Sequence, residues 1–108
     1  MYPTEPKCLV FVAITQAVQR APHYPEGHNL YGLVCEARSD YCSAIAAYRR
    51  ARFAANVSTV ATPSSCKHDI TANLSRALCV AGHFLDGTRE CKVLEEEGDL
   101  RDLHLYFP

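Results

Sequence analysis

The chain has little net charge and no long apolar run. Its 108 residues carry 11 Lys and Arg against 12 Asp and Glu, a formal charge of −1, which excludes strong non-specific attraction to nucleic acid or to acidic membranes. No stretch approaches the roughly 20 apolar residues that span a bilayer. The apolar run at 8–14 has no net-positive leader before it and no small-residue cleavage site after it. We expect no membrane helix, no secretory signal and no direct nucleic-acid binding.

Closely spaced cysteines are missing, because none of the six cysteines is part of a Cys-x-x-Cys pair. An even count in a short chain can indicate a disulfide framework, so disulfides and metal ligation stay open as alternatives. Most of these residues lie among Ala, Leu and Val, where a free cysteine behaves as a small hydrophobe. The pattern favours reduced thiols and a reducing compartment, the cytoplasm or also the nucleus. The six are Cys8, Cys35, Cys42, Cys66, Cys79 and Cys91.

The motifs of common enzyme classes are absent as well. The sequence has no glycine-rich phosphate loop, no Ser-His-Asp signature and no paired carboxylate motif. Cys66 and His68 have the composition of half a zinc site, but a second pair at ligand spacing is missing. Cys35 and Cys91 lie in predicted helix interiors, which favours core packing over nucleophilic catalysis. We expect no enzymatic activity, no catalytic residue, no cofactor and no metal.

The sequence does contain a strong helical periodicity in a chain that is 48% hydrophobic and 21% charged, as in one small globular domain. Within residues 25–56, two apolar stripes recur at helical spacing, and the short polar break at 38–40 separates them. This pattern predicts a helical hairpin in an all-α fold. The stripes consist of Leu30, Leu33, Val34 and Ala37, then of Ala44, Ile45, Ala47, Tyr48 and Ala51.

The hairpin sequence resembles the tetratricopeptide repeat. A shift of 34 residues, the length of one such repeat, aligns Cys8 with Cys42 and Ala13 with Ala47. The family pattern is matched by Gly32, Asp40, Tyr41, Ala44, Tyr48 and Ala51, whereas His28, Tyr31, Cys35, Ser39 and Asn56 depart from it. In this register Gly32 leaves room where the facing helix crosses. The resemblance implies an α-solenoid of antiparallel helix hairpins, about two and a half repeats long.

The same register divides the chain into repeats. Residues 1–24 would hold the second helix of a preceding repeat, 25–56 a complete repeat, 57–67 an inserted loop, 68–98 another complete repeat, and 99–108 the start of a truncated one. The expected helices are near 5–21, 26–38, 41–55, 67–81 and 84–97. Because neither end has the polar cap that an open solenoid needs, we expect a fragment or a truncated product of a longer protein.

Within the flanking repeats, inward-facing positions follow from the apolar spacing. In the first helix Val10, Ile14 and Ala17 are expected to face inward. In the second complete repeat Leu74, Ala77 and Leu78 form the first stripe, Gly82 ends that helix, and Phe84 begins the next. That next helix is expected to turn Leu85, Cys91 and Leu94 inward.

Over roughly residues 17–100 the chain also resembles the large tetratricopeptide scaffold subunits of superkiller complexes, in their plant form. The likeness lies in the segments APHYPEGHNLYGLVCEARSDYCSAIAAYRRAR and ITANLSRALCVAGHFLDGTRECKVLEEEGDL. The resemblance implies a cytoplasmic scaffold that holds an RNA helicase and a WD-repeat protein. Such a scaffold feeds the RNA exosome in 3′-to-5′ mRNA decay.

Candidate partner-binding residues are polar side chains on the predicted helices. They are Asn29, Arg49, Asn73 and Arg76, and arginine is enriched at interface hot spots. An alternative function is a co-chaperone module that binds the acidic C-terminal peptides of Hsp70 or Hsp90. The clamp of that family needs lysines that the matching positions here lack, so the scaffold interpretation is favoured.

Overall fold

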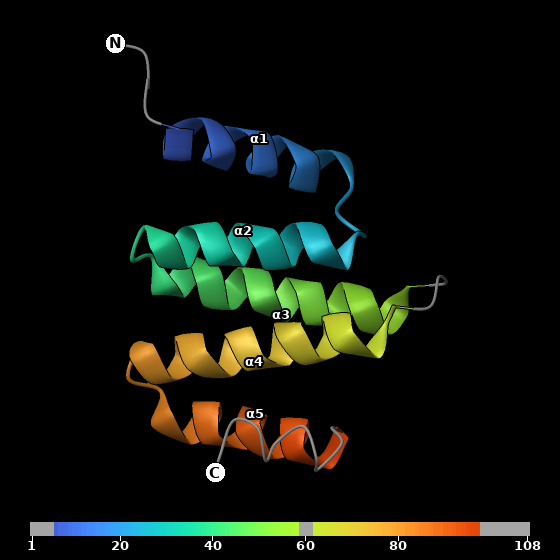
Figure 1. The fold of residues 1–108 in the computed structure, drawn as a ribbon, viewed down its shortest axis with the longest axis vertical. Helices are drawn as coiled ribbons and strands as arrows, with labels where there is room; N and C mark the ends of the chain where they lie inside the picture. The colour runs from blue at the N-terminus through green and yellow to red at the C-terminus, as the bar shows by residue number, and fades with distance from the viewer. Residues whose placement is uncertain (1–5, 59–61, 98–108) are drawn as a thin grey trace.

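A computed structural model describes residues 6–58 and 62–97. This part of the chain forms five helices and no strand, which confirms the predicted all-α fold. The helices are α1 (Pro6–Arg20), α2 (Pro25–Ala37), α3 (Tyr41–Val57), α4 (Ser64–Val80) and α5 (Phe84–Glu97). They stack in chain order, each running roughly antiparallel to its neighbour (Figure 1). None of the five has the length and apolar character that crossing a membrane requires.

The turn after α2 and the turn after α4 have the same backbone geometry. Ser39 has φ +61° and Gly82 has φ +92°, the left-handed conformation that closes many helices. The residue after each turn donates its backbone N–H to a carbonyl five residues back, at 2.9 Å from Asp40 to Cys35 and at 2.8 Å from His83 to Leu78. The two hairpins, α2–α3 and α4–α5, are therefore closed by one turn type, 43 residues apart along the chain.

Most of the described core lies between α2, α3 and α4. Its main cluster contains Cys35, Ala44, Ile45, Tyr48, Leu74, Ala77 and Leu78, and a smaller one joins Ala51 and Ala55 of α3 to Ile70 of α4. The apolar stripes predicted for α3 and for the middle of α4 are thus buried. A Cβ on Gly32 would overlap the ring of Tyr48, so α2 and α3 are close at the predicted position.

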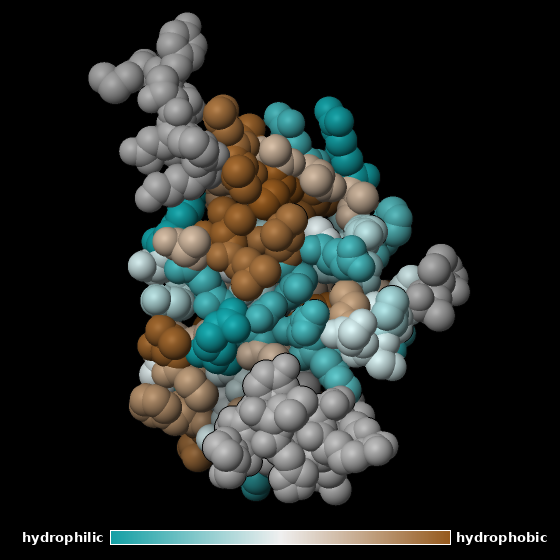
Figure 2. Space-filling model, in the orientation of Figure 1, coloured by the Kyte–Doolittle hydropathy of each residue, from teal (hydrophilic) through white to brown (hydrophobic). Residues whose placement is uncertain are grey.

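The stripe predicted on α2 is wrong. Leu30 is 49% exposed and Leu33 is 38% exposed, whereas the buried residues of α2 are His28, Gly32 and Cys35. The reason is steric, because α3 can approach only over a residue as small as glycine, and that contact turns the leucine face outward. Figure 2 shows apolar side chains gathered over α1 and α2 on the viewed face.

The predicted inward faces of α1 and α5 also need correction. On α1, Val10 is 48% exposed and Ala17 is exposed, while Ile14 is buried as expected. Phe11 contacts the ring of Tyr31, with ring centroids 5.7 Å apart, so the face of α1 toward α2 includes Phe11. The contacts of α1 with α2 therefore decide which of its apolar residues are buried.

On α5, Phe84 and Leu85 are 67% and 84% exposed, because they lie at the start of the helix and face away from α4. Cys91 is half-buried against α4, and the side chain of Leu94 lies outside the described residues. Helix α4 begins at Ser64, directly after Pro63, so the segment before it is shorter than the predicted loop at 57–67. The segment 99–108 lies outside the described residues.

Candidate protein-binding surface

Helices α2 and α4 are not consecutive, yet they contact each other directly. On each helix, three residues at spacings of three and four share one face. We call the resulting face the α2/α4 surface, made of Asn29, Leu33, Glu36, Asn73, Arg76 and Val80. Leu33 and Val80 are its exposed apolar members.

Polar contacts join the two helices across this surface. The side-chain amide of Asn73 donates to the Oδ1 of Asn29 at 2.9 Å. The guanidinium of Arg76 donates to both carboxylate oxygens of Glu36, at 3.1 Å from Nε and 2.7 Å from Nη2. Tyr48 of α3 donates its hydroxyl to the same carboxylate. Three helices therefore meet at Glu36.

The electrostatics of this contact keep both donors protonated. The hydrogen bond to Glu36 raises the pKa of Arg76. Burial raises the pKa of Tyr48 strongly, and its hydrogen bond to Glu36 raises it further. The phenol therefore remains a hydrogen-bond donor at neutral pH, and the arginine remains charged.

Of the four predicted partner-binding residues, the structure brings three together. Asn29, Asn73 and Arg76 lie on the α2/α4 surface, where each has a protein partner. Arg49 lies apart from them on α3 and is exposed. The neighbouring Arg52 forms an ion pair with Glu90 of α5, so the arginines of α3 do not form one basic patch.

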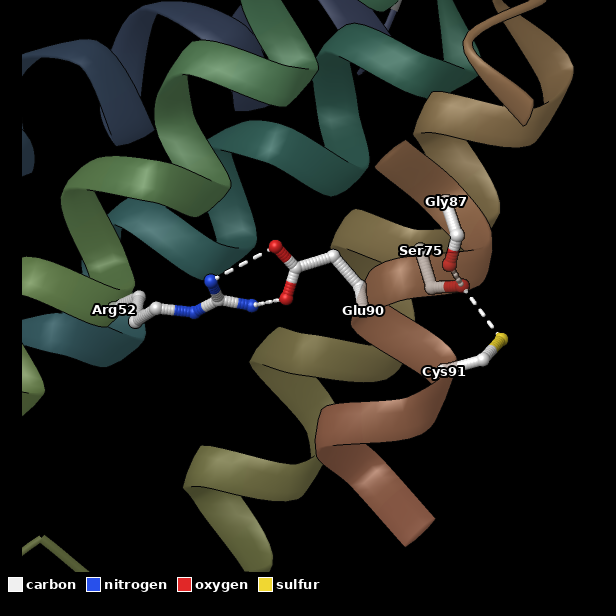
Figure 3. A network of polar contacts seen from close by, with 5 residues as sticks. All are labelled: Arg52, Ser75, Gly87, Glu90 and Cys91. Carbon is white, nitrogen blue, oxygen red and sulfur yellow. Dashed lines mark hydrogen bonds and ion pairs between the residues drawn. The ribbon is translucent and has the colours of Figure 1, made fainter. Parts of the chain in front are cut away.

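The second hairpin contains a polar contact that sequence reasoning missed. Ser75 is 6% exposed, and its hydroxyl donates to the backbone oxygen of Gly87 at 2.9 Å (Figure 3). The Sγ of Cys91 lies 3.0 Å from the same hydroxyl oxygen. Since the hydroxyl proton is used on Gly87, the Cys91 thiol is the donor to Ser75. Cys91 thus bonds within the α4–α5 interface.

Ser75, Gly87 and Cys91 follow Gly32, Ala44 and Tyr48 by 43 residues each. A Cβ on Gly87 would overlap the Sγ of Cys79 and lie 3.2 Å from the Ser75 carbonyl oxygen, so α4 and α5 are also close here. The 43-residue spacing, the predicted repeat plus nine inserted residues, was the sequence signal that could have found these positions.

The thiols and imidazoles of the described residues do not gather into a metal site. Cys35, Cys42, Cys66, Cys79 and Cys91 are free, and burial raises the pKa of Cys35 and of Cys66. Within residues 6–58 and 62–97, no three His, Cys, Asp or Glu side chains lie close enough together to hold a metal ion.

Comparison with known proteins gave no relative. No family model, no curated protein and no solved structure matches this chain. A functional proposal therefore depends on the residues of the chain and on their arrangement.

Proposed function

We propose that this chain is a non-enzymatic protein-interaction scaffold built of tetratricopeptide-like hairpins. By its resemblance, it belongs to the scaffold subunit of a superkiller complex and acts in exosome-dependent 3′-to-5′ mRNA decay in the cytoplasm. Its partners would be an RNA helicase and a WD-repeat protein, and through them the exosome.

The observation that carries the proposal is the recurrence of one hairpin. The turns at Ser39 and Gly82 share their backbone hydrogen bonds, and the contacts of Gly32 with Tyr48 and of Ser75 with Cys91 follow the same 43-residue relation. The direct contact of α2 with α4 supports it too, since stacked repeats pack their first helices against one another. Such stacking produces a continuous surface for protein partners.

The α2/α4 surface is the binding face we assign to this scaffold. It presents exposed Leu33 and Val80 beside polar groups that already have partners. Binding there buries apolar area, with no need to break the Arg76–Glu36 pair. The co-chaperone alternative fits less well, because Asn29 and Asn73 bond to each other and Arg76 is neutralised by Glu36. A peptide carboxylate would have to displace these contacts.

Co-purification tests the proposal. The purified chain is mixed with the helicase and WD-repeat subunits of a superkiller complex, and retention of each is measured. Leu33→Asp places a charge on the α2/α4 surface, and Phe53→Asp is the matched control, because Phe53 is 68% exposed on α3. We expect the chain and the Phe53→Asp variant to retain a subunit, and Leu33→Asp to lose it while keeping its helical circular dichroism.

Retention of neither subunit by the folded chain would contradict the superkiller assignment. Equal loss in both variants would contradict the choice of surface. Binding of an Hsp70 or Hsp90 C-terminal peptide that Asn73→Ala and Arg76→Ala abolish would favour the co-chaperone module instead.

A further inference from the structure

A hollow of about 300 Å³ lies on the side of α4 that faces away from the α2/α4 surface. Ser64, Lys67, His68 and Thr71 line it from α4, and their spacing places them on one face of the helix, opposite Asn73. Arg52 and Asn56 of α3 border it on one side, and Val93 of α5 on the other. The volume is at the lower end of the range for small-molecule sites.

The charged groups around the hollow favour an anion. Arg52, Lys67 and His68 come from two helices and all line it. Arg52 uses one N–H of each terminal nitrogen on Glu90, which leaves three of its five N–H donors free of that carboxylate. Glu90 is the opposing charge, so Arg52, Lys67 and Glu90 together carry a net charge of +1.

Thr71 lines the same space, and its hydroxyl has no hydrogen-bond partner in the described part of the chain. Thr71 is 4% exposed, and no hydrogen bond joins its Oγ1 to any residue in 6–58 or 62–97. Every fully buried side-chain oxygen or nitrogen in the described part has a partner. The Thr71 oxygen therefore borders open space, and the space that Thr71 lines is the hollow.

The start of α4 adds to the positive potential. The helix has no side-chain cap and no acidic residue in its first turn, so the backbone N–H groups that precede the first intrahelical bond, from Lys67 to Pro63, have no side-chain acceptor. Apolar side chains complete the wall, namely Ala55, Ile70 and Val93. The surroundings thus combine donors and cations with a small apolar side.

We propose that this hollow binds the phosphate monoester of a small organic molecule. Such a group carries nearly two negative charges and three acceptor oxygens, which match Lys67, His68, Arg52 and the Thr71 hydroxyl. The apolar wall receives a compact carbon body. This binding is independent of the scaffold function and lies on another face of the molecule.

Titration of the ¹⁵N-labelled chain with phenyl phosphate tests the site. We expect amide shifts confined to the start of α4 and to the neighbouring parts of α3 and α5, weaker binding of inorganic phosphate, and no binding of phenol. Lys67→Gln should weaken phenyl phosphate binding about tenfold, since it removes a charge-assisted hydrogen bond. Arg50→Gln is the control, because Arg50 is exposed on the opposite side of α3 from Arg52, and it should bind as the unmodified chain does.

Thr71→Val separates a ligand role of the hydroxyl from a structural one. We expect weaker phenyl phosphate binding with an unchanged or higher melting temperature, because the hydroxyl has no protein partner to lose. A lower melting temperature with unchanged binding would overturn the role of Thr71. Absence of shifts near α4, or equal effects of Lys67→Gln and Arg50→Gln, would overturn the site. Tighter binding of a short phosphoserine peptide than of phenyl phosphate would overturn the assignment to a small molecule.

Discussion

Two glycines of α2 have opposite surroundings and so test the close packing of the first hairpin. A Cβ on Gly32 would lie 2.7 Å from the Cδ1 of Tyr48, whereas a Cβ on Gly27 would meet only Val18, at 3.8 Å. Tyr48 is fully buried and its hydroxyl is bonded to Glu36, so its ring cannot swing away. Glycine at 32 is therefore a packing requirement, while glycine at 27 is not.

We expect Gly32→Ala to lower the free energy of unfolding by about 1–3 kcal/mol, because the methyl group overpacks the helix contact. Gly27→Ala should raise it by about 0.5–1 kcal/mol, because alanine is the better helix former. Urea denaturation of both variants measures the difference. Equal stabilisation by the two substitutions would show that α2 and α3 do not approach closely at Gly32.

The Tyr48 phenol makes stability depend on alkaline pH. Its pKa is raised in the folded chain, by burial first and by the Glu36 hydrogen bond second, relative to about 10 for a free tyrosine. The folded state therefore holds this proton more tightly than the unfolded state does. The resulting stability is fully present below about pH 10 and is lost as the pH rises toward the folded-state pKa.

Tyr48→Phe should accordingly be less stable than the unmodified chain at pH 8, since a hydrogen bond is lost, and should lose less stability between about pH 9.5 and pH 11. Burial also raises the pKa of Tyr31 and of Cys35, so part of the alkaline slope remains in the variant. Melting temperatures measured across this pH range test the expectation. Parallel curves would contradict it.

At the scale of the helices, the two hairpin turns differ in the residue that adopts the left-handed conformation. Both adopt positive φ, but one uses Ser39 and the other uses Gly82. A side chain in the left-handed region costs roughly 1–2 kcal/mol, and a Cβ on Gly82 would meet nothing within 4 Å. Substitutions at Ser39 and Gly82 therefore measure the cost of backbone strain. At Gly82 an added side chain causes no steric clash that would obscure this cost.

We expect Ser39→Gly to stabilise the chain by up to about 1 kcal/mol, and Gly82→Ala to destabilise it by roughly 1–2 kcal/mol. Thermal unfolding followed by circular dichroism gives both values. Opposite signs for the two substitutions are the expected signature of a shared turn type, and equal signs would argue against it.

At the scale of the whole molecule, the two hairpins are joined mainly through the contact of α3 with α4. Ile70 is 1% exposed and packs on Ala51 and Ala55, and the Arg52–Glu90 ion pair bridges the same two hairpins. The apolar contact is the larger contribution, because an ion pair that is still partly exposed to solvent contributes little to stability. We therefore expect the hairpins to unfold together.

Ile70→Ala should remove about 2–5 kcal/mol of stability and lower the protection of backbone amides in α2, α3 and α4 alike. Hydrogen exchange followed by NMR resolves the helices individually. Loss of protection confined to α4 and α5 would show that the α2–α3 hairpin is stable by itself.

The sequence by itself determined the five helices of residues 6–58 and 62–97, the turns of the two hairpins and the buried stripes of α3 and α4. These features depend on local signals: helical periodicity, the polar break at 38–40, and Gly82 after the last residues of α4. Alanines cover so much of α3 that either neighbour can pack on it. Its burial therefore needed no knowledge of which helix lies where.

Only the tertiary structure decided which faces of α1, α2 and α5 are buried. The leucine stripe of α2 is outside because Gly32 admits Tyr48 on another face, a choice that depends on a residue 16 positions away. The Asn29–Asn73 and Glu36–Arg76 contacts join residues 44 and 40 positions apart, and the hollow beside Thr71 needs three helices. Such contacts follow from the distance of closest approach between helices, which periodicity in one helix does not encode.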